Sequence, residues 1–314
     1  MINILGKRYL FFGISLLVIV PGLILGLLQS INSDWLGKLP LAIDFTGGSL
    51  LEVQFPSGTV PQPADVIGVY TQMGIKDVQV QTTGADRILV RSPFMQDAER
   101  ATIVQALSKT FGQEIAVLRF DSVGPTIGKE VVGRASVAVA VAALAVVVYM
   151  TLAFRGLPHA FRYGICAIIA MVHDVAVVLS LGVIGGKFFG WQIDALYLTA
   201  LLTVIGFSVQ DKVVVFDRIR ENSLLHRRLP FETLVNHSIV QTLQRSINTQ
   251  LMTVEFMLLA LALFGGVTLR EFAVILLVGL FSGTYSSIFI AAPILVLWEK
   301  REWRQWFRRN TTTA

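Results

Sequence analysis

Six long apolar segments dominate the sequence. They cover residues 9–28, 135–154, 163–184, 195–216, 247–264 and 272–298. Crossing the hydrocarbon core of a bilayer takes about 20 predominantly apolar residues in a helix, and lipid offers no hydrogen-bond partner to an open backbone. The segments lack the alternation of polar and apolar residues that is typical of barrel strands. The pattern therefore predicts six transmembrane helices, the first within residues 1–30 and the other five within residues 131–298.

The region between the first two apolar segments has a different pattern, typical of a small α/β domain. We expect strands at 48–55, 77–82, 86–91 and 114–120 and helices at about 62–73 and 95–110. The order β-α-β-β-α-β is that of a ferredoxin-like α+β domain, which we place at residues 40–130. Two helices would cover one sheet face, and the other face or an edge could receive a partner strand or an extended peptide. The alternative is an exposed sheet without a ligand.

Composition supports the membrane assignment. Hydrophobic residues make up 54% of the 314 residues and charged residues 15%, with a mean hydropathy of +0.66, whereas soluble domains carry roughly 25% charged residues. The one cysteine, Cys166, excludes an intramolecular disulfide and a cysteine-based metal site. We expect it to be a packing residue.

The basic residues indicate orientation. The net charge is +5, but Lys and Arg lie beside the apolar segments instead of forming one stripe with aromatics, which argues against a nucleic-acid partner. They gather before the first segment, between the second and third, between the fourth and fifth, and in the tail at residues 299–314. The positive-inside rule then places both termini in the cytoplasm and the predicted α/β domain outside. The first segment has no small-residue cleavage site behind it, so we expect an uncleaved anchor.

Two charged residues of the fourth and fifth segments are candidates for proton transfer. An ionisable side chain at the bilayer centre costs at least about 2.5 to 3.5 kcal/mol and needs a partner or a function. Asp211 lies in the cytoplasmic half of the fourth segment, and Arg245 precedes the fifth at the same level if the two helices are antiparallel. Facing each other, they could hold or release a proton, or form a static pair that fixes helix register.

Three further ionisable residues lie within the apolar segments. Asp174 is midway along the third segment beside His173, and adjacent helical residues point about 100° apart. A capping or packing role and a proton relay both fit this position. Lys212 could extend toward the cytoplasm or neutralise Asp211 or Glu255, the latter near the middle of the fifth segment.

Several patterns of enzymes are missing from the sequence. No Walker-type phosphate loop occurs, and no nucleophile-and-base pattern or zinc-ligand helix is evident. We therefore expect no catalytic residue, no cofactor and no metal. One charge that moves through the membrane potential releases about 2.3 kcal/mol per 100 mV, a suitable energy source for a protein with intramembrane acids.

Several motifs occur in a fixed order along nearly the whole chain. They are Asp44-Phe45-Thr46-Gly47-Gly48 within residues 42–49, and the segments 122–130, 173–175, 216–222, 241–249 and 279–293. In this order they resemble the SecD/SecF family of protein-export proteins, which is part of the RND superfamily. The chain departs from the family pattern at Ala42, Gln210, Lys212 and Glu255.

This resemblance implies a function and a set of partners. The chain would sit in the cytoplasmic (inner) membrane and, with an obligate SecD-like subunit, use the proton motive force to assist export of unfolded polypeptides. Asp211 and Arg245 match positions implicated in proton conduction, and Asp174 belongs to the same expected pathway. Further implied partners are the SecYEG translocon, YajC and membrane lipid. One alternative is half of an RND-type small-molecule or lipid transporter, and another is a structural assembly factor.

Glycine and proline positions frame the predicted outer domain. Gly47 and Gly48 can take φ > 0 where the chain leaves the membrane, and Gly124-Pro125 can turn it back. They are either ordinary turns or hinges that couple domain and bundle.

Two more motifs belong to the helices. Gly279 and Gly283 of the sixth segment allow close helix packing. The cytoplasmic motif after the fourth segment contains Asp217, Arg218, Arg220 and Glu221. It is either a solvated interfacial face or a salt-bridged collar that moves with the helix.

Overall fold

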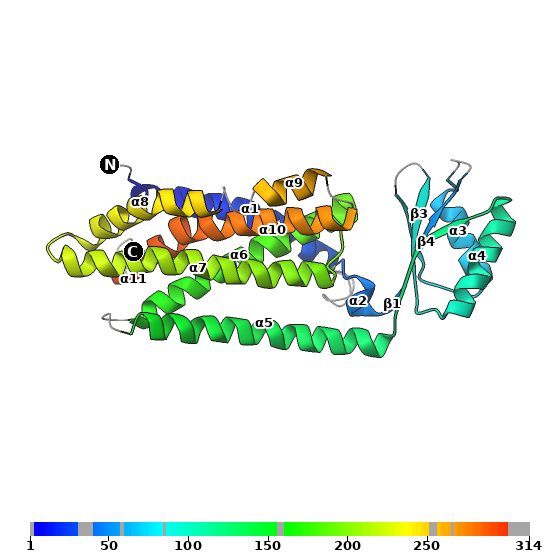
Figure 1. Ribbon diagram of the computed structural model, residues 1–314, viewed down its shortest axis with the longest axis horizontal. Coiled ribbons are helices and arrows are strands. Elements are labelled where there is room, and N and C mark those ends of the chain that lie inside the picture. Colours follow the sequence, from blue (N-terminus) through cyan, green and yellow to red (C-terminus); the bar gives the residue numbers. More distant parts are fainter. Residues whose placement is uncertain are drawn as a thin grey trace, which may run out of the picture. The chain divides into compact units, whose positions relative to one another are not determined.

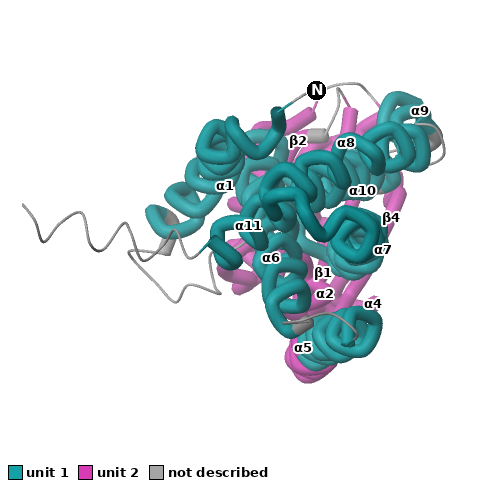
Figure 2. The backbone as a smooth tube through the Cα atoms, turned by 90° about the vertical axis from the view of Figure 1, so that its left-hand side faces the viewer, with its two compact units in different colours: residues 1–40, 137–314 teal, residues 41–136 magenta. Residues whose placement is uncertain are grey.

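The computed structural model divides the chain into two compact units. It describes residues 3–30, 40–56, 60–83, 86–155, 160–250, 256–264 and 267–300. One unit comprises residues 1–40 and 137–314 and the other residues 41–136, which are coloured separately in Figure 2.

The first unit is a bundle of helices whose long axes run beside one another (Figure 1). Its elements are η1 (Leu5–Lys7), α1 (Arg8–Ser30), most of α5 (Pro125–Ala153), α6 (Ala160–Phe189), α7 (Ala195–Leu225), α8 (Phe231–Gln250), α9 (Phe256–Phe264), α10 (Val267–Ser286), the π-helical turn η4 (Ser287–Ala291) and α11 (Ala292–Glu299).

Five helices in the described part of the chain are long and apolar enough to cross a membrane. They are Leu5–Leu28, Pro125–Ala153, Phe161–Phe189, Ala195–Leu225 and Leu269–Glu299. The remaining predicted segment, 247–264, is divided between the end of α8, residues outside the described ranges and α9. Glu255 also lies outside the described residues. The chain is thus a helical membrane protein with five observed candidate spans.

Small residues let α10 lie close to its neighbours. A Cβ atom at Gly279 would lie 2.3 Å from Cγ2 of Val204 on α7, and one at Gly283 would lie 3.2 Å from Cα of Ser208. Both distances are shorter than ordinary van der Waals contact, so only glycine fits this packing without a shift of the neighbour. The close approach places polar residues of α10 beside those of α7, as expected for helix interfaces rich in small residues.

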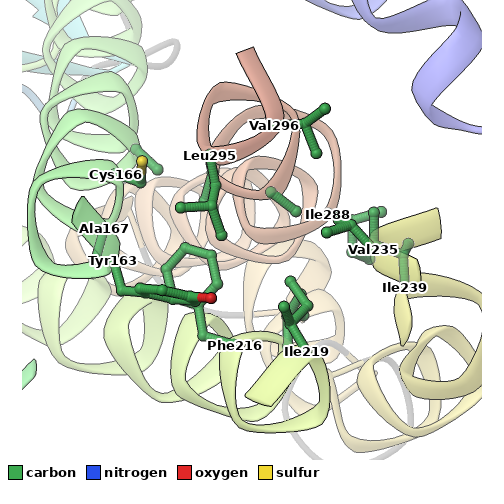
Figure 3. Close-up of a cluster of buried hydrophobic side chains, with 14 of the residues drawn as sticks. Tyr163, Cys166, Ala167, Phe216, Ile219, Val235, Ile239, Ile288, Leu295 and Val296 are labelled. Atoms are coloured by element: carbon green, nitrogen blue, oxygen red, sulfur yellow. The ribbon is translucent and has the colours of Figure 1, made fainter. Parts of the chain in front are cut away.

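A hydrophobic cluster holds one part of the bundle together (Figure 3). Tyr163 of α6 stacks on Phe154 with ring centroids 5.6 Å apart and meets Phe216 of α7 edge-on at 5.4 Å. Cys166 is buried in the same cluster. The cysteine therefore packs among apolar side chains, as the sequence predicts.

The second unit contains a four-stranded antiparallel sheet in the order β2-β3-β1-β4. Its elements are α2 (Ile43–Thr46), β1 (Gly48–Gln54), α3 (Pro63–Gln72), β2 (Gln79–Thr83), β3 (Arg87–Ser92), α4 (Asp97–Phe111) and β4 (Ala116–Val123). The predicted order of strands and helices is confirmed, with each boundary within three residues of the expected one. The short helix α2 was not predicted.

Alternation along the strands separates the two faces of this sheet. Leu51 and Val53 of β1 and Ile88 and Val90 of β3 are buried in one apolar cluster with residues of α3 and α4. The intervening positions include Glu52, Arg87 and Arg91 but also Leu50 and Leu89, and Arg87 lies 3.8 Å from Glu52 across the two strands. The helices therefore cover the apolar face, and the other face carries most of the charged residues of these two strands.

Ion pairs tie the start of α1 and the end of α11 to α8. Nη1 of Arg8 lies 3.2 Å from Oε1 of Glu232, and Nζ of Lys300 donates to Oε2 of the same residue. The hydrogen bond from Lys300, together with the positive charges of Lys300 and Arg8, lowers the pKa of Glu232 below its ordinary value of 4.5. The ionised carboxylate is therefore favoured in the folded state.

We predict a pH-dependent loss of stability from this site. Because the folded pKa is lowered, the contribution of Glu232 is complete above about pH 4.5 and is lost as the pH falls through the folded pKa. Thermal unfolding of the full chain in detergent should show a difference between wild type and Glu232→Gln that shrinks on acidification below pH 4.5. Glu114→Gln, at an exposed position, is the control. A constant difference across this pH range would contradict the prediction.

Candidate functional site

A charged pair lies inside the helical bundle. Nζ of Lys212 on α7 is 2.9 Å from Oδ2 of Asp174 on α6, and both residues are 0% exposed. An unpaired charge at such a position would carry a large desolvation penalty. The pair therefore fixes the rotation of α6 against α7.

Serine hydroxyls complete the surroundings of Asp174. Ser208 of α7 donates to Oδ2 at 2.5 Å, Ser286 of α10 donates to Oδ2 at 2.7 Å, and Ser282 donates to Oδ1 at 2.8 Å. Ser208 and Lys212 are four residues apart, as are Ser282 and Ser286, so each couple lies on one helix face. With Lys212 and a further contact from His173, five groups surround a carboxylate that has about four lone-pair positions. The groups around this carboxylate therefore occupy all of its hydrogen-bonding positions.

The observed contact of Lys212 differs from the contacts that the sequence suggested. Lys212 was expected to extend toward the cytoplasm or to neutralise Asp211 or Glu255, but it is fully buried and contacts Asp174. The reason is helical geometry, because Asp211 and Lys212 are adjacent and their side chains point about 100° apart. They therefore face different neighbours.

His173 connects this site to α1 through an aromatic residue. Its Nδ1 lies 3.1 Å from Oδ1 of Asp174, and its ring stacks on Tyr285 with centroids 6.2 Å apart. The Tyr285 hydroxyl donates to the carbonyl of Phe11 at 2.7 Å. Nε2 of His173 is buried without a hydrogen-bond partner among the described residues. The adjacent His and Asp thus touch each other, although their positions on the helix differ by about 100°.

Asp211 is held much more loosely than Asp174. It is half-buried, and its carboxylate accepts hydrogen bonds from Ser246 of α8 at 3.1 Å and from Ser287 of η4 at 3.2 Å. Ser287 begins the π-helical turn, directly after Ser286, which binds Asp174. Such turns are frequent at functional sites. Two adjacent serines therefore reach two different carboxylates.

Arg245 of α8 does not bind this second carboxylate, which belongs to α7. Ser246, the next residue, makes the contact to Asp211. Arg245 is exposed, and no ion pair joins it to Asp211 in the part of the chain that the structure describes. The two residues share a level along the helices, as expected, without the expected contact. The roles of Asp211, Arg245 and Asp174 in proton transfer stay predictions.

The serines that organise both carboxylates were missed in the sequence analysis. No role is assigned to Ser282, Ser286 or Ser287 from the sequence. A usable signal existed, because hydroxyls four residues apart in an apolar segment form a polar stripe on one helix face. Which carboxylate the stripe serves could be found only from the structure.

The two glycine motifs of the second unit meet each other. Gly47 and Gly48 have φ values of +72° and +124°, which favour glycine. A Cβ at Gly47 would lie 2.8 Å from Cα of Pro125, the first residue of α5, and one at Gly128 would lie 2.8 Å from N of Gly47. Phe45, in the preceding helix α2, is buried. The entry to the sheet and the exit into α5 are therefore packed backbone against backbone.

Ion pairs lie within the charged motif at residues 216–222. Nη1 of Arg218 lies 2.5 Å from Glu221, and Nη2 of Arg220 lies 3.1 Å from Asp217. Nε of Arg218 also donates to Gln241 of α8 at 2.6 Å. The end of α7 is thus fastened to α8.

The fold and the buried polar site together define a class of protein. Apolar helices that enclose paired charges and hydroxyls are typical of membrane transport proteins, because ionisable groups are rare in lipid unless they serve a pathway. The described residues hold no group of three or more His, Cys, Asp or Glu side chains that could bind a metal.

Comparison with known proteins gives the family. The profile of the protein export membrane protein SecD/SecF C-terminal region matches residues 103–301, and that of the SecD/SecF GG motif matches residues 38–55. Protein translocase subunit SecF of Anaerolinea thermophila is 68% identical over 100% of this chain and 99% of its own length. The SecF of Thermobaculum terrenum is 46% identical over 100% and 99%. The chain belongs to the SecF branch of the SecD/SecF family.

Solved structures agree with this assignment. The crystal structure of SecDF, a translocon-associated membrane protein from Thermus thermophilus, is 30% identical with a TM-score of 0.80 over 95% of this chain. A SecDF structure in a super-membrane-facing form is 31% identical with a TM-score of 0.66 over 98% of this chain. The chain spans 39% and 40% of the lengths of these two proteins.

Gly47, Pro125 and Gly128, which pack backbone against backbone, form a glycine junction. This junction leads to a stability prediction. Gly47→Ala should destabilise the full chain by about 1 to 3 kcal/mol more than Gly74→Ala. Gly74 also has a positive φ, +81°, but open space where a Cβ would be. Gly47 combines φ +72° with ψ 169°, a region open essentially to glycine alone, so the difference reports this backbone cost together with the clash with Pro125. Denaturant or thermal unfolding measures the difference, and equal losses for both variants would show that the junction is not tightly packed.

The buried pair leads to a second prediction. Asp174→Asn leaves the Lys212 ammonium buried without a counter-ion and should cost about 3 to 5 kcal/mol. The double variant Asp174→Asn, Lys212→Met removes both charges and should recover most of that loss in thermal unfolding. A double variant as unstable as the single one would argue against the ion pair as the dominant interaction.

Proposed function

We propose that this SecF-type subunit works with a SecD-type partner and couples proton movement past Asp211 to polypeptide export. The family assists protein translocation and is not an enzymatic one. The observation that carries the mechanism is the contrast between Asp174, which four donors and His173 surround, and Asp211, which two long hydrogen bonds hold.

This contrast favours Asp211 as the group that exchanges protons. A carboxylate with few donors loses little when it is protonated, whereas one bound to an ammonium and several hydroxyls loses much. Asp211 is also half-buried, which permits access. Asp174 then serves as the fixed charge that keeps α6, α7 and α10 in register, the packing alternative for this residue.

Protonation of Asp211 would act on the helices that bind it. Its two donors lie on α8 and on η4, the irregular turn that follows α10. Loss of the negative charge would weaken both hydrogen bonds and release these elements from α7. The proton would thereby change helix packing instead of performing a chemical reaction.

Several features support a partner in the membrane. Very little of the apolar length of α5 and α1 is buried within the chain, so lipid or another helix must cover it. Arg245 is exposed at the level of Asp211, where a partner could contact it. The matched SecDF proteins are more than twice as long as this chain. We assign the missing half to the SecD-type subunit, and contact with SecYEG and YajC to the assembled complex.

The proposal also includes a ferredoxin-like fold for the second unit and a sixth transmembrane helix. The strand order β2-β3-β1-β4 with helices between β1 and β2 and between β3 and β4 supports a ferredoxin-like domain. The end of α8 together with α9 supports a sixth span. An even number of spans, with the basic loops on one side, supports our proposal that both termini lie in the cytoplasm. The sheet face that the helices leave uncovered would then be available to an exported polypeptide.

The glycine junction supports a link between bundle and outer domain. Gly47 contacts the first residue of α5, so a shift of that helix would move the entry to β1 directly. A packed junction transmits displacement better than a flexible turn, because the backbones cannot separate without losing contact.

The proposal is tested by export in membrane vesicles with the SecD-type partner and an imposed proton gradient. Wild type should gain export from the gradient, and Asp211→Asn should lose that entire gain while its complex stays assembled. Asp65→Asn, which removes the same group from an exposed position of α3, should keep the gain.

Two other outcomes of this export experiment would contradict the proposed role of Asp211. If assembled Asp211→Asn gains as much as wild type, the proton pathway does not use this carboxylate. If the complex fails to assemble, the charge acts in assembly, as in the structural hypothesis.

A further inference from the structure

The ammonium group of Lys212 lies in an environment made of oxygen atoms. Its Nζ is 2.9 Å from Oδ2 of Asp174 and 3.2 Å from the carbonyl oxygen of Ser208, and it contacts the Ser208 hydroxyl. The hydroxyl of Ser286 binds the same carboxylate oxygen, and that of Ser282 binds the other. Exposure ranges from 0% to 6% across this set.

These are the ligand types of a hard cation. Carboxylate, carbonyl and hydroxyl oxygens bind alkali and alkaline-earth ions, and backbone carbonyls inside helical bundles coordinate Na⁺ in transport proteins. One carboxylate balances one positive charge, so the oxygen set suits a monovalent ion. In this protein that charge is the ammonium of Lys212.

We propose that Oδ2 of Asp174 and the carbonyl and hydroxyl oxygens of Ser208 form a cage for one monovalent metal cation, and that the tethered ammonium of Lys212 fills it. Ser282 and Ser286 hold the carboxylate of Asp174 in place for this cage. Lys212 is then a specificity-determining residue, because it supplies the positive charge covalently and excludes Na⁺. A consequence for export rests on the proposed function. Because the ammonium of Lys212 fills the cage at Asp174, Asp211 is the carboxylate that remains open to protons. The cage itself is testable by ion binding, without any export assay.

Removal of the tethered ammonium should convert the cage into an ion site. Lys212→Ser removes the ammonium and leaves space, while Asp174 keeps its serine donors. A cation that binds only the folded state raises its stability with increasing concentration. The unfolding temperature of this variant should therefore rise with NaCl, by about 3 °C or more at saturation.

The experiment is thermal unfolding of the full chain in detergent in NaCl, KCl or choline chloride of equal ionic strength. Wild type should show the same midpoint in the three salts. Lys212→Ser should have a low midpoint in choline chloride and a saturable rise in NaCl. The double variant Asp174→Asn, Lys212→Ser keeps the space but lacks the carboxylate, and should show no rise specific to Na⁺.

Each remaining outcome overturns the cage. Equal midpoints of Lys212→Ser in all three salts would mean that Asp174 takes a proton instead of a metal ion. A sodium-specific rise in the double variant or in wild type would place ion binding elsewhere. If Lys212→Ser fails to fold even in NaCl while the double variant folds, sodium does not enter the site. None of these results bears on Asp211, so the proposed export function stands or falls separately.

Discussion

The structure depends on the rule that a charge inside a membrane needs a partner. Asp174 and Lys212 satisfy each other across α6 and α7, and Ser282 and Ser286 bring α10 to the same point. Gly279 removes the side chain that would otherwise hold α10 away from Val204 of α7. Three helices are therefore fixed by one polar centre, which specifies their rotation in a way that apolar packing alone does not.

The same helices carry a second carboxylate in a different state. Asp211 is bound by Ser246 and Ser287, and the latter starts a π-helical turn. The adjacent residues Ser286 and Ser287 thus bind two different carboxylates, Asp174, which is held firmly, and Asp211, which is held loosely. This division lets the bundle keep its packing at Asp174 while the contacts around Asp211 change. A fixed centre next to a changeable one is what a proton-driven movement of helices requires.

Much of the fold could be predicted from the sequence because its signals are local. Apolar length gave the candidate spans, alternation gave the order of strands and helices, and the motifs gave the family. The site was harder to predict, because it depends on helix rotation. Lys212 meets Asp174, which is 38 residues away, while its neighbour Asp211 faces other helices. The expected contact between Asp211 and Arg245 failed for the same reason, since a shared level does not fix the direction of a side chain.

The central claim is that Asp211 exchanges a proton while Asp174 stays ionised. Infrared difference spectra of the complex with its SecD-type partner, recorded between neutral and acidic pH, report the C=O band of a newly protonated carboxyl group. The account predicts a band that disappears in Asp211→Asn and persists in the double variant Asp174→Asn, Lys212→Met. A band that persists in Asp211→Asn and disappears when Asp174 is replaced would contradict it.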